Sequence, residues 1–276
     1  MPELPEVETI ANGLQKRVAG DVIESVWLSG RAQVLKSPAQ EIAAMLEGAR
    51  IRLVRRVGKH IAIDLAESEP HSGEYLLRGQ WIVHLGMTGR IIIAEPQAEL
   101  VKHTHLIATL ASGKELRYVD PRMFGKLQVV AAGGFEAPGA EPIGADREEF
   151  RRLFHRRKTP IKSALLNQKL LSGIGNIYAD ESLFRAGIRP RRRAASLTRA
   201  DLLRLYDAIQ QVLAEAIAAG GSSISDYVDA TGDAGSFQFQ HRVYQRENKP
   251  CLVCGTPIKR FVIAGRSSHY CPRCQR

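Results

Sequence analysis

The sequence predicts an α+β fold, and the spacing of apolar residues along the chain leads to this prediction. Apolar residues recur at helical spacing in residues 5–18, short apolar runs separated by turns occupy residues 22–131, and helical spacing returns after residue 149. The 276 residues, 44% of them hydrophobic and 25% charged, are enough to form two domains with sizeable cores.

The amino-terminal half is predicted to contain one helix followed by strands. The apolar residues of 5–18 share one helical face and are Val7, Ile10, Leu14 and Val18. The β-rich runs after them are bounded by polar or glycine-containing turns, as in a sandwich or barrel. They are residues 22–28, 51–54, 61–65, 81–85, 91–94, 106–110 and 127–131. Residues 131–146 are rich in Ala, Gly and Pro and are predicted to form a linker.

The carboxy-terminal half is predicted to be helical. The expected helices are residues 150–155, 161–171, 177–186 and 201–219. Thr198, with Asp201 three residues later, resembles a capping box for the last helix, and Gly220-Gly221 is a natural stop. Residues 221–240 are rich in Ser, Gly and Asp, which predicts a mobile loop.

The spacing of the four cysteines predicts one structural zinc ion. They form two C-x-x-C pairs with 16 residues between the pairs, and they are Cys251, Cys254, Cys271 and Cys274. This spacing suits a four-cysteine zinc site, which leaves the metal no open coordination position. The alternation of Ile258, Arg260 and Val262 between the pairs favours a β-hairpin. Disulfides are the alternative, which a cytoplasmic location disfavours.

The charge of the chain indicates a polyanionic partner. Its formal net charge is +10, and residues 241–276 carry eight Arg or Lys against one Glu. The amino terminus has no basic stretch that leads into an apolar run, and no apolar run approaches the length of a membrane span. We therefore expect a cytoplasmic protein without a signal peptide or a membrane partner.

The first six residues, Met1-Pro2-Glu3-Leu4-Pro5-Glu6, allow a reactive amine. Removal of Met1 would leave Pro2 with a secondary amine, which can attack a carbonyl carbon to form an iminium. An N-terminal amine has a pKa of about 7.7 to 8.0, so a sizeable fraction is unprotonated at neutral pH. Glu3 and Glu6 could move protons beside it. The alternative is that these residues only begin a helix, since Pro and Glu are favoured there.

A second candidate site is the turn LSGIGNIY at residues 171–178. A glycine-bearing turn that runs into a helix start offers N–H groups to phosphate, and Asn176 adds a side-chain donor. Basic runs at residues 151–158 and 191–193 flank it, which suggests a helix-turn-helix variant on a nucleic acid backbone. The alternative is that the glycines serve only packing or turn geometry.

Five sequence blocks together resemble one known family. They are PELPEVET at the start, HLGMTGR at 84–90, DPRMFG at 120–125, LNQKLLSGIGNIYADESLFRAGI at 166–188 and the closing cysteine pairs. In this order they closely resemble the formamidopyrimidine-DNA glycosylases, bacterial base-excision repair enzymes also called 8-oxoguanine-DNA glycosylases. The resemblance spans essentially the whole chain.

The resemblance implies a fold and a domain plan. The fold is an α+β one, with a helix and β-sandwich, a helix-two-turn-helix domain and a β-hairpin zinc finger. The implied boundaries are a catalytic domain at residues 1–130, a linker at 131–148, a helix-two-turn-helix domain with a lesion-recognition loop at 149–237, and the zinc finger at 238–276. The expected protein is a monomer that binds one structural Zn²⁺ and damaged double-stranded DNA.

The resemblance also implies a mechanism. In this family the mature terminal proline, here Pro2, attacks C1′ of a damaged nucleotide, the base leaves, and β- and δ-elimination cut the strand. Glu3 matches the acid and base that helps open the sugar, Glu6 helps to orient the site, and Lys59 matches a lysine that meets the flanking phosphate. Without the resemblance, Lys59 would be interpreted as an ordinary lysine at a strand end.

Further residues match positions that contact DNA. In the family such residues extrude the damaged nucleotide, and here Met87 would fill the void, Phe124 would wedge the stack and Arg122 would bind the orphaned base. The residues that match phosphate contacts are His84, Lys158, Asn176, Tyr244 and Arg266.

The chain departs from the family pattern at two places, and two other functions remain open. Residues 67–80 are longer than the family's turn there, and Gln245 replaces a glycine. The first alternative is the related endonuclease VIII type, which prefers oxidised pyrimidines, although Leu4 and the Arg122-Met123-Phe124 cluster resemble the purine-directed branch. The second is a zinc-ribbon DNA-binding protein without enzymatic activity, which would not account for the amino terminus.

Overall fold

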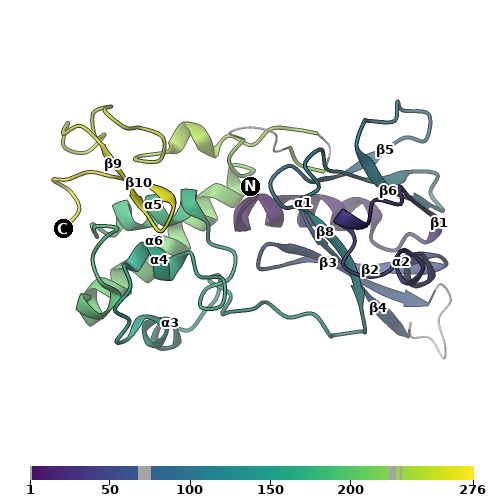
Figure 1. Cartoon of the computed structure of the whole chain (residues 1–276), viewed down its shortest axis with the longest axis horizontal. Coiled ribbons are helices and arrows are strands. Elements are labelled where there is room, and N and C mark those ends of the chain that lie inside the picture. Colours follow the sequence, from purple (N-terminus) through teal and green to yellow (C-terminus); the bar gives the residue numbers. More distant parts are fainter. Residues whose placement is uncertain (1, 68–75, 224–227, 231) are drawn as a thin grey trace. The chain divides into compact units, whose positions relative to one another are not determined.

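The computed structural model describes residues 2–67, 76–223, 228–230 and 232–276 (Figure 1). By its contacts the chain forms two compact units. The first contains Met1–Glu136 and Gly220–Gly235, and the second contains Ala137–Ala219 and Ser236–Arg276. Both helices and sheets are present, so the predicted α+β class is confirmed.

The first unit contains two four-stranded antiparallel sheets with one apolar core between them. One sheet has the order β1-β6-β7-β5, with bounds Ile23–Leu28, Thr104–Leu110, Glu115–Val119 and Arg90–Ala94. The other has the order β2-β3-β4-β8, with bounds Ala49–Val57, His60–Glu67, Leu77–His84 and Lys126–Val130. This arrangement is the predicted sandwich.

Helix α1 (Leu4–Val18) packs against β2 and β3 in the first unit (Figure 1). Its predicted apolar face is buried in the core, with Val7, Ile10, Leu14 and Val18 at most 1% exposed. The helix begins with a capping box in which the side chain of Glu6 accepts the N–H of Glu3. The first six residues therefore do begin a helix, as one of the two interpretations predicted. A helix start does not exclude a chemical role for the Pro2 amine.

The sequence did not predict two elements of the first unit. Helix α2 (Ala39–Leu46) buries only Ile42 and Leu46, one turn apart, so its apolar periodicity is too short to recognise. Strand β7 buries Arg117 among its apolar residues. The guanidinium of Arg117 donates to four backbone carbonyls, which the local sequence does not reveal.

The second unit is built from helices α3 (Arg147–Phe154), α4 (Ile161–Leu165), α5 (Asn176–Arg185) and α6 (Arg199–Ala218). It ends in a hairpin of β9 (Lys259–Ile263) and β10 (Arg266–Tyr270). The capping box of α6 is confirmed, because Thr198 and Asp201 exchange hydrogen bonds of 3.0 and 3.1 Å. Gly220 and Gly221 follow with positive φ, as predicted for a stop.

The prediction of one helix over residues 161–171 is wrong, because α4 ends at Leu165. The Asn167 side chain accepts the N–H of Lys169 at 3.0 Å. The amide of Gln168 accepts the N–H of Gly173 at 2.9 Å and donates to the carbonyl of Ile174 at 2.8 Å. Polar side chains that bond nearby backbone groups compete with helix continuation.

The predicted loop at residues 221–240 is only partly described. Residues 224–227 and 231 lie outside the described part of the chain. Phe237–Gln240 forms a 3-10 helix with Phe237 buried, so the prediction of a loop is wrong for these four residues. Ala230 joins the core of the first unit, and its carbonyl accepts the N–H of Ile93.

Candidate functional site

The amino terminus forms a buried carboxylate cluster in the first unit. Pro2 is buried, and Glu3 and Glu6 are 4% and 2% exposed. One oxygen of Glu6, Oε2, accepts the N–H of Glu3 at 2.8 Å, and the other accepts the N–H of Ser222 at 2.7 Å. Gly221 makes this approach possible, because a Cβ at its position would lie 2.9 Å from Oε1 of Glu6. The structure thus brings three of the four predicted catalytic residues together at the start of α1.

Lys59, the fourth, lies in the turn between β2 and β3 and is 8% exposed. It follows Gly58, which has φ of 59°. The pKa of His84 is lowered mainly because the imidazole is buried and next because of the charge of Lys59. Lys59 is therefore close enough to His84 for its charge to act on the imidazole. A positive charge at this place suits a phosphate.

The residues predicted to enter DNA lie on two neighbouring loops. Met87 follows β4, and Arg122 and Phe124 lie between β7 and β8. Met87 is 43% exposed and Phe124 50% exposed, although both are large apolar side chains. The guanidinium carbon of Arg122 lies 4.6 Å from the centre of the Phe124 ring. The structure brings these three residues together at exposed tips, away from the core.

In the second unit, Asn176 contacts the residue that follows Arg266. Asn176 is the first residue of α5, and its Nδ2 donates to Oγ of Ser267 at 3.3 Å. Arg266 is exposed and begins β10, next to Ser267. A helix start and an arginine that lie 90 positions apart in sequence thus form one potential phosphate site.

Lys158 is exposed between α3 and α4.

The position of Tyr244 depends on a residue that the sequence did not single out. The carboxylate of Glu181 accepts the N–H groups of Arg242, Val243 and Tyr244 at 2.8 to 2.9 Å. Burial raises the pKa of Glu181, and these three donors oppose that shift. Glu181 is 3% exposed on α5. One feature of the sequence could have pointed to Glu181. It falls one turn after Ile177, on the buried face of the helix.

Gln245, the residue that replaces a glycine, has φ of 55°. This left-handed conformation favours glycine, so a residue with a Cβ is strained at this position. The backbone directly after Tyr244 is therefore strained, which the sequence alone could not reveal.

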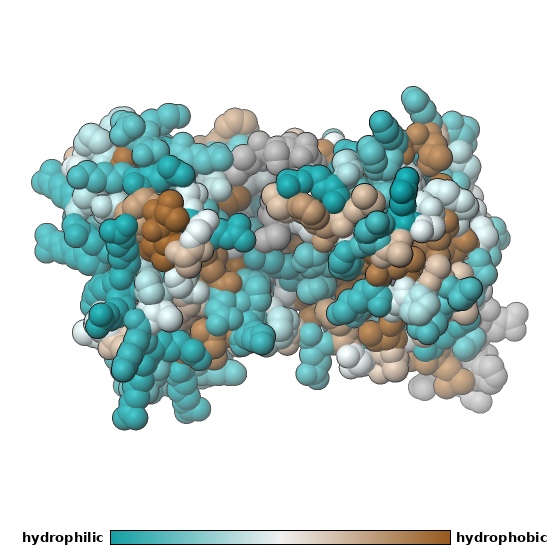
Figure 2. Space-filling view, in the orientation of Figure 1, coloured by the Kyte–Doolittle hydropathy of each residue, from teal (hydrophilic) through white to brown (hydrophobic). Residues whose placement is uncertain are grey.

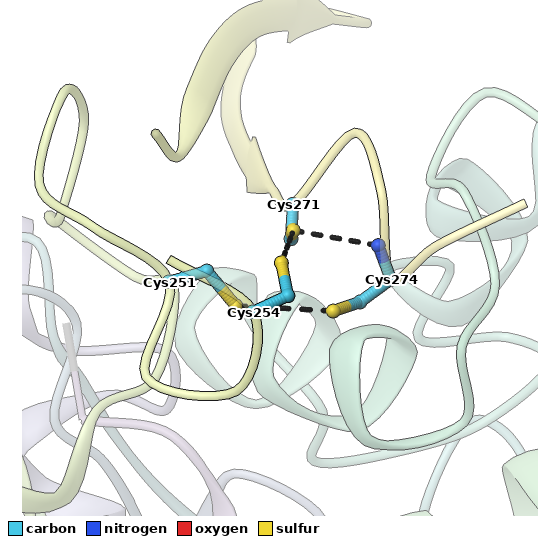
Figure 3. Close-up of side chains that lie close together, drawn as sticks. All are labelled: Cys251, Cys254, Cys271 and Cys274. Carbon is cyan, nitrogen blue, oxygen red and sulfur yellow. Dashed lines mark hydrogen bonds between the residues drawn. The ribbon is translucent and has the colours of Figure 1, made fainter. Parts of the chain in front are cut away.

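The four cysteines lie together in two turns, as Figure 3 shows. Their sulfur atoms all lie within 4.8 Å of one another, and all four thiols are free of disulfides. The Sγ atoms of Cys251 and Cys274 are 3.9 Å apart, and those of Cys254 and Cys271 are 3.5 Å apart. A tetrahedral zinc with bonds of about 2.3 Å requires sulfur separations of about 3.8 Å. The residues therefore fit a four-thiolate zinc site, and the disulfide alternative is excluded for this structure.

Hydrophilic side chains predominate on the face of the second unit seen in Figure 2, around a smaller apolar area. The exposed basic residues of this unit's carboxy-terminal segment include Arg242, Lys249, Lys259, Arg260 and Arg266. Such a surface attracts polyanions through its summed charge.

Comparisons with known proteins match every part of this architecture. Models described as "Formamidopyrimidine-DNA glycosylase N-terminal domain" and "Formamidopyrimidine-DNA glycosylase H2TH domain" match residues 1–127 and 138–228. A "Zinc finger found in FPG and IleRS" matches residues 248–276. Formamidopyrimidine-DNA glycosylase of Solibacter usitatus is 43% identical over 100% of both chains. The chain belongs to the formamidopyrimidine-DNA glycosylase family.

Other members of the family agree with this assignment. Formamidopyrimidine-DNA glycosylase of Desulforamulus reducens is 41% identical over 100% of this chain and 99% of its own. A mutant of Lactococcus lactis FPG, solved in complex with a Fapy-dG containing DNA, is 32% identical with a TM-score of 0.88 over 100% of both chains. The FPG protein of Thermus thermophilus is 38% identical with a TM-score of 0.84, over 99% of this chain and 98% of that one.

Family membership confirms the resemblance and the predicted fold. It also confirms one structural zinc, since the matched zinc finger contains the four clustered cysteines. The alternative of a zinc-ribbon DNA-binding protein would account only for residues 248–276. The match to the glycosylase N-terminal domain covers residues 1–127 as well. Among the described helices, none has the length and apolar character needed to cross a membrane.

Proposed function

We propose that this protein is a bifunctional DNA glycosylase and AP lyase of base excision repair. Its substrates would be oxidised purines in duplex DNA, namely 8-oxoguanine and formamidopyrimidines. The observation that carries the proposal is the full-length family match combined with the buried cluster of Pro2, Glu3 and Glu6. A related chain with the same fold was solved with Fapy-dG containing DNA, which supports the substrate class.

The chemistry begins at Pro2, which we propose is the terminal residue after removal of Met1. The lone pair of its amine forms a bond to C1′ of the damaged nucleotide, while the bond from C1′ to the base breaks and the base leaves with the electron pair of that bond. The carboxylate of Glu3 takes the proton that the Pro2 nitrogen then loses and delivers it to the ring oxygen of the sugar, so that the bond from C1′ to this oxygen breaks and an iminium links C1′ to Pro2. Loss of a C2′ proton then expels the 3′ phosphate, and a second elimination expels the 5′ phosphate.

Glu6 is proposed to orient this site instead of exchanging protons with the substrate. Its two oxygens accept the N–H groups of Glu3 and Ser222, so it fixes the backbone that carries Glu3. Lys59 is proposed to contact the phosphate beside the lesion, which the low exposure and basic surroundings of Lys59 and His84 support.

DNA binding would use the other predicted residues. Met87, Arg122 and Phe124 are proposed to fill the space of the extruded nucleotide and to contact the opposite base, because they are exposed on adjoining loops. The phosphate contacts are proposed to be His84, Lys158, Asn176, Tyr244 and Arg266. The zinc would supply no chemistry here, since four thiolates complete its coordination, and would hold the hairpin that carries Arg266.

The domain boundaries at residues 130, 148 and 237 remain a proposal, as do the monomeric state and the cytoplasmic location. The family models end at residues 127 and 228, close to two of these boundaries. By contacts, Gly220–Gly235 group with the first unit, whereas the proposed plan places residues 220–235 with the helix-two-turn-helix domain.

Oxidised pyrimidines are a second candidate substrate class. Lactococcus lactis FPG was also solved with an oxidised pyrimidine containing DNA, and it is 31% identical to this chain with a TM-score of 0.87. This observation favours activity on both oxidised purines and oxidised pyrimidines over activity on one of these classes alone.

Single-turnover cleavage of matched duplexes tests the proposed substrate. One duplex would carry 8-oxoguanine opposite cytosine, and another would carry oxidised thymine at the same position. We expect faster cleavage at 8-oxoguanine, and no cleavage of the unmodified duplex. Faster cleavage at oxidised thymine would instead support the endonuclease VIII type, and no cleavage of either lesion by the zinc-loaded protein would refute the proposed function.

A further inference from the structure

Asp120 directly follows β7, at the start of the loop that carries Arg122 and Phe124, and is fully buried. Its carboxylate accepts four hydrogen bonds. Oδ1 accepts the hydroxyl of Thr88 at 2.6 Å and the N–H of Arg122 at 3.3 Å. Oδ2 accepts the N–H of Gly125 at 2.8 Å and the hydroxyl of Tyr118 at 3.2 Å. A carboxylate has about four acceptor sites, so all of them are used.

These bonds join two loops that are far apart in sequence. Thr88 follows Met87 on the loop after β4, whereas Arg122 and Gly125 bracket Phe124 on the loop before β8. The bond from Thr88 to Asp120 is a side-chain link between the two loops. It is short, and one partner is fully buried, which are the conditions in which a hydrogen bond constrains geometry most.

The backbones of the two loops also touch. A Cβ placed on Gly86 would lie 2.5 Å from the nitrogen of Gly125 and 2.6 Å from the carbonyl carbon of Phe124. A Cβ on Gly125 would collide with the hydroxyl of Tyr118. The glycines let the loops approach, and the hydroxyl and carboxylate between them fix their separation.

The second loop is held in an unfavourable backbone conformation. Met123 lies between Arg122 and Phe124 and has φ of 54°, which a side chain like that of Met rarely adopts. Such a conformation persists only where surrounding bonds determine it. The carbonyl of Asp120 accepts the N–H of Met123, and the side chain of Asp120 accepts the neighbouring N–H groups, so Asp120 supplies these bonds.

We propose that Thr88 and Asp120 are positioning residues that make the two loops one rigid element, so that Met87, Arg122 and Phe124 enter the DNA stack together. This inference rests on the proposed function, because it concerns extraction of a nucleotide from duplex DNA. Neither Thr88 nor Asp120 has to touch DNA in this role. Pre-organising the tips lowers the entropy cost of forming the extruded complex.

Paired substitutions at Thr88 separate this role from a purely structural one. Thr88→Val removes the hydroxyl and keeps the shape, whereas Thr88→Ser keeps the hydroxyl. Thr109→Val is a matched control in the same unit, at a partly exposed position of β6. Each variant would be assayed on duplex DNA with 8-oxoguanine and on single-stranded DNA with an abasic site, which offers no stacked duplex to open.

We expect Thr88→Val to slow excision from the duplex about tenfold, the loss of roughly one charge-assisted hydrogen bond, and to slow cleavage of the single strand much less. Thr88→Ser should restore most of the duplex rate, and Thr109→Val should resemble the unmodified chain. An equal loss on both substrates, or an unchanged duplex rate, would overturn the inference. If the unmodified protein cleaved neither substrate, the proposed function itself would fail.

Discussion

Glu6 joins the first turn of α1 to Ser222, because Oε1 of its carboxylate accepts the Ser222 N–H at 2.7 Å while Oε2 holds the N–H of Glu3. Both bonds need an acceptor oxygen, and the side chain is 2% exposed. One carboxylate thus fixes the backbone of the proposed acid and the start of the segment after α6.

Glu6→Gln should therefore impair both stability and excision. Its amide NH₂ cannot accept from a backbone N–H, so one buried donor loses its partner, at a cost of about 1–3 kcal/mol. Urea unfolding would measure the free energy of unfolding, and cleavage of an 8-oxoguanine duplex would measure the rate. Glu24→Gln, at an exposed position of β1, is the control and should change neither. A Glu6→Gln variant as stable and active as the unmodified chain would contradict this role.

Gln245→Gly should stabilise the second unit. Gln245 has φ of 55°, where a residue with a Cβ is strained by about 1–2 kcal/mol, partly offset by the greater unfolded-state entropy of glycine. We expect a net gain of roughly 0.5–1 kcal/mol in thermal or urea unfolding. Gln245→Ala keeps the Cβ and should give no gain. A destabilised glycine variant would show that the Gln245 side chain contributes more than its backbone costs.

Removal of zinc should loosen the hairpin of β9 and β10 and weaken DNA binding. Without the metal, four clustered thiols no longer hold the two turns together, and structural zinc sites contribute directly to folding. Metal analysis should find one zinc per chain, and fluorescence anisotropy with a lesion duplex should show lower affinity after chelation, restored by added zinc. Unchanged affinity in the verified metal-free protein would refute the structural role of zinc.

Acid should destabilise the first unit partly through His60. Burial, and next the charge of His84, lower the pKa of His60 from 6.5 to about 4. As the pH falls from 6.5 toward 4, the unfolded chain binds a proton at His60 that the native chain does not, so the free energy of unfolding decreases. The contribution of His60 to the free energy of unfolding is therefore complete above pH 6.5 and is lost as the pH falls from 6.5 to 4.

His60→Phe should reduce this pH dependence. The ring of His60 lies 4.9 Å from that of Phe135 and 4.8 Å from that of His84, so an aromatic replacement can keep both contacts. Urea unfolding at pH 7 and pH 5 should show the variant losing roughly 1–2 kcal/mol less than the unmodified chain. Identical losses in the two proteins would contradict the assigned pKa shift.

The sequence alone predicted the features that depend on local pattern or on fixed spacing. The apolar face of α1, the capping box of Thr198 and Asp201, and the cysteine pairs all repeat at intervals set by helix or metal geometry. The end of α4 was missed because Gln168 bonds backbone groups beyond the helix.

The support around the candidate site could not be predicted in the same way. Ser222 lies 216 residues from Glu6, Thr88 lies 32 residues from Asp120, and Glu181 lies more than 60 residues from the N–H groups that it accepts. Such contacts are determined by the tertiary fold and leave no local periodicity in the sequence. The reactive residues could be proposed from the resemblance, whereas the residues that hold them required the structure.

Covalent trapping tests the central claim most directly. Borohydride reduces an iminium to a stable amine, so protein incubated with an 8-oxoguanine duplex and borohydride should become cross-linked to DNA, and peptide mapping should place the link on Pro2. A variant with one glutamine inserted before Pro2, to keep the proline nitrogen within a peptide bond without adding an amine side chain, should bind the duplex but form no cross-link. A cross-link at another residue, or undiminished trapping by the extended variant, would contradict catalysis by the Pro2 amine.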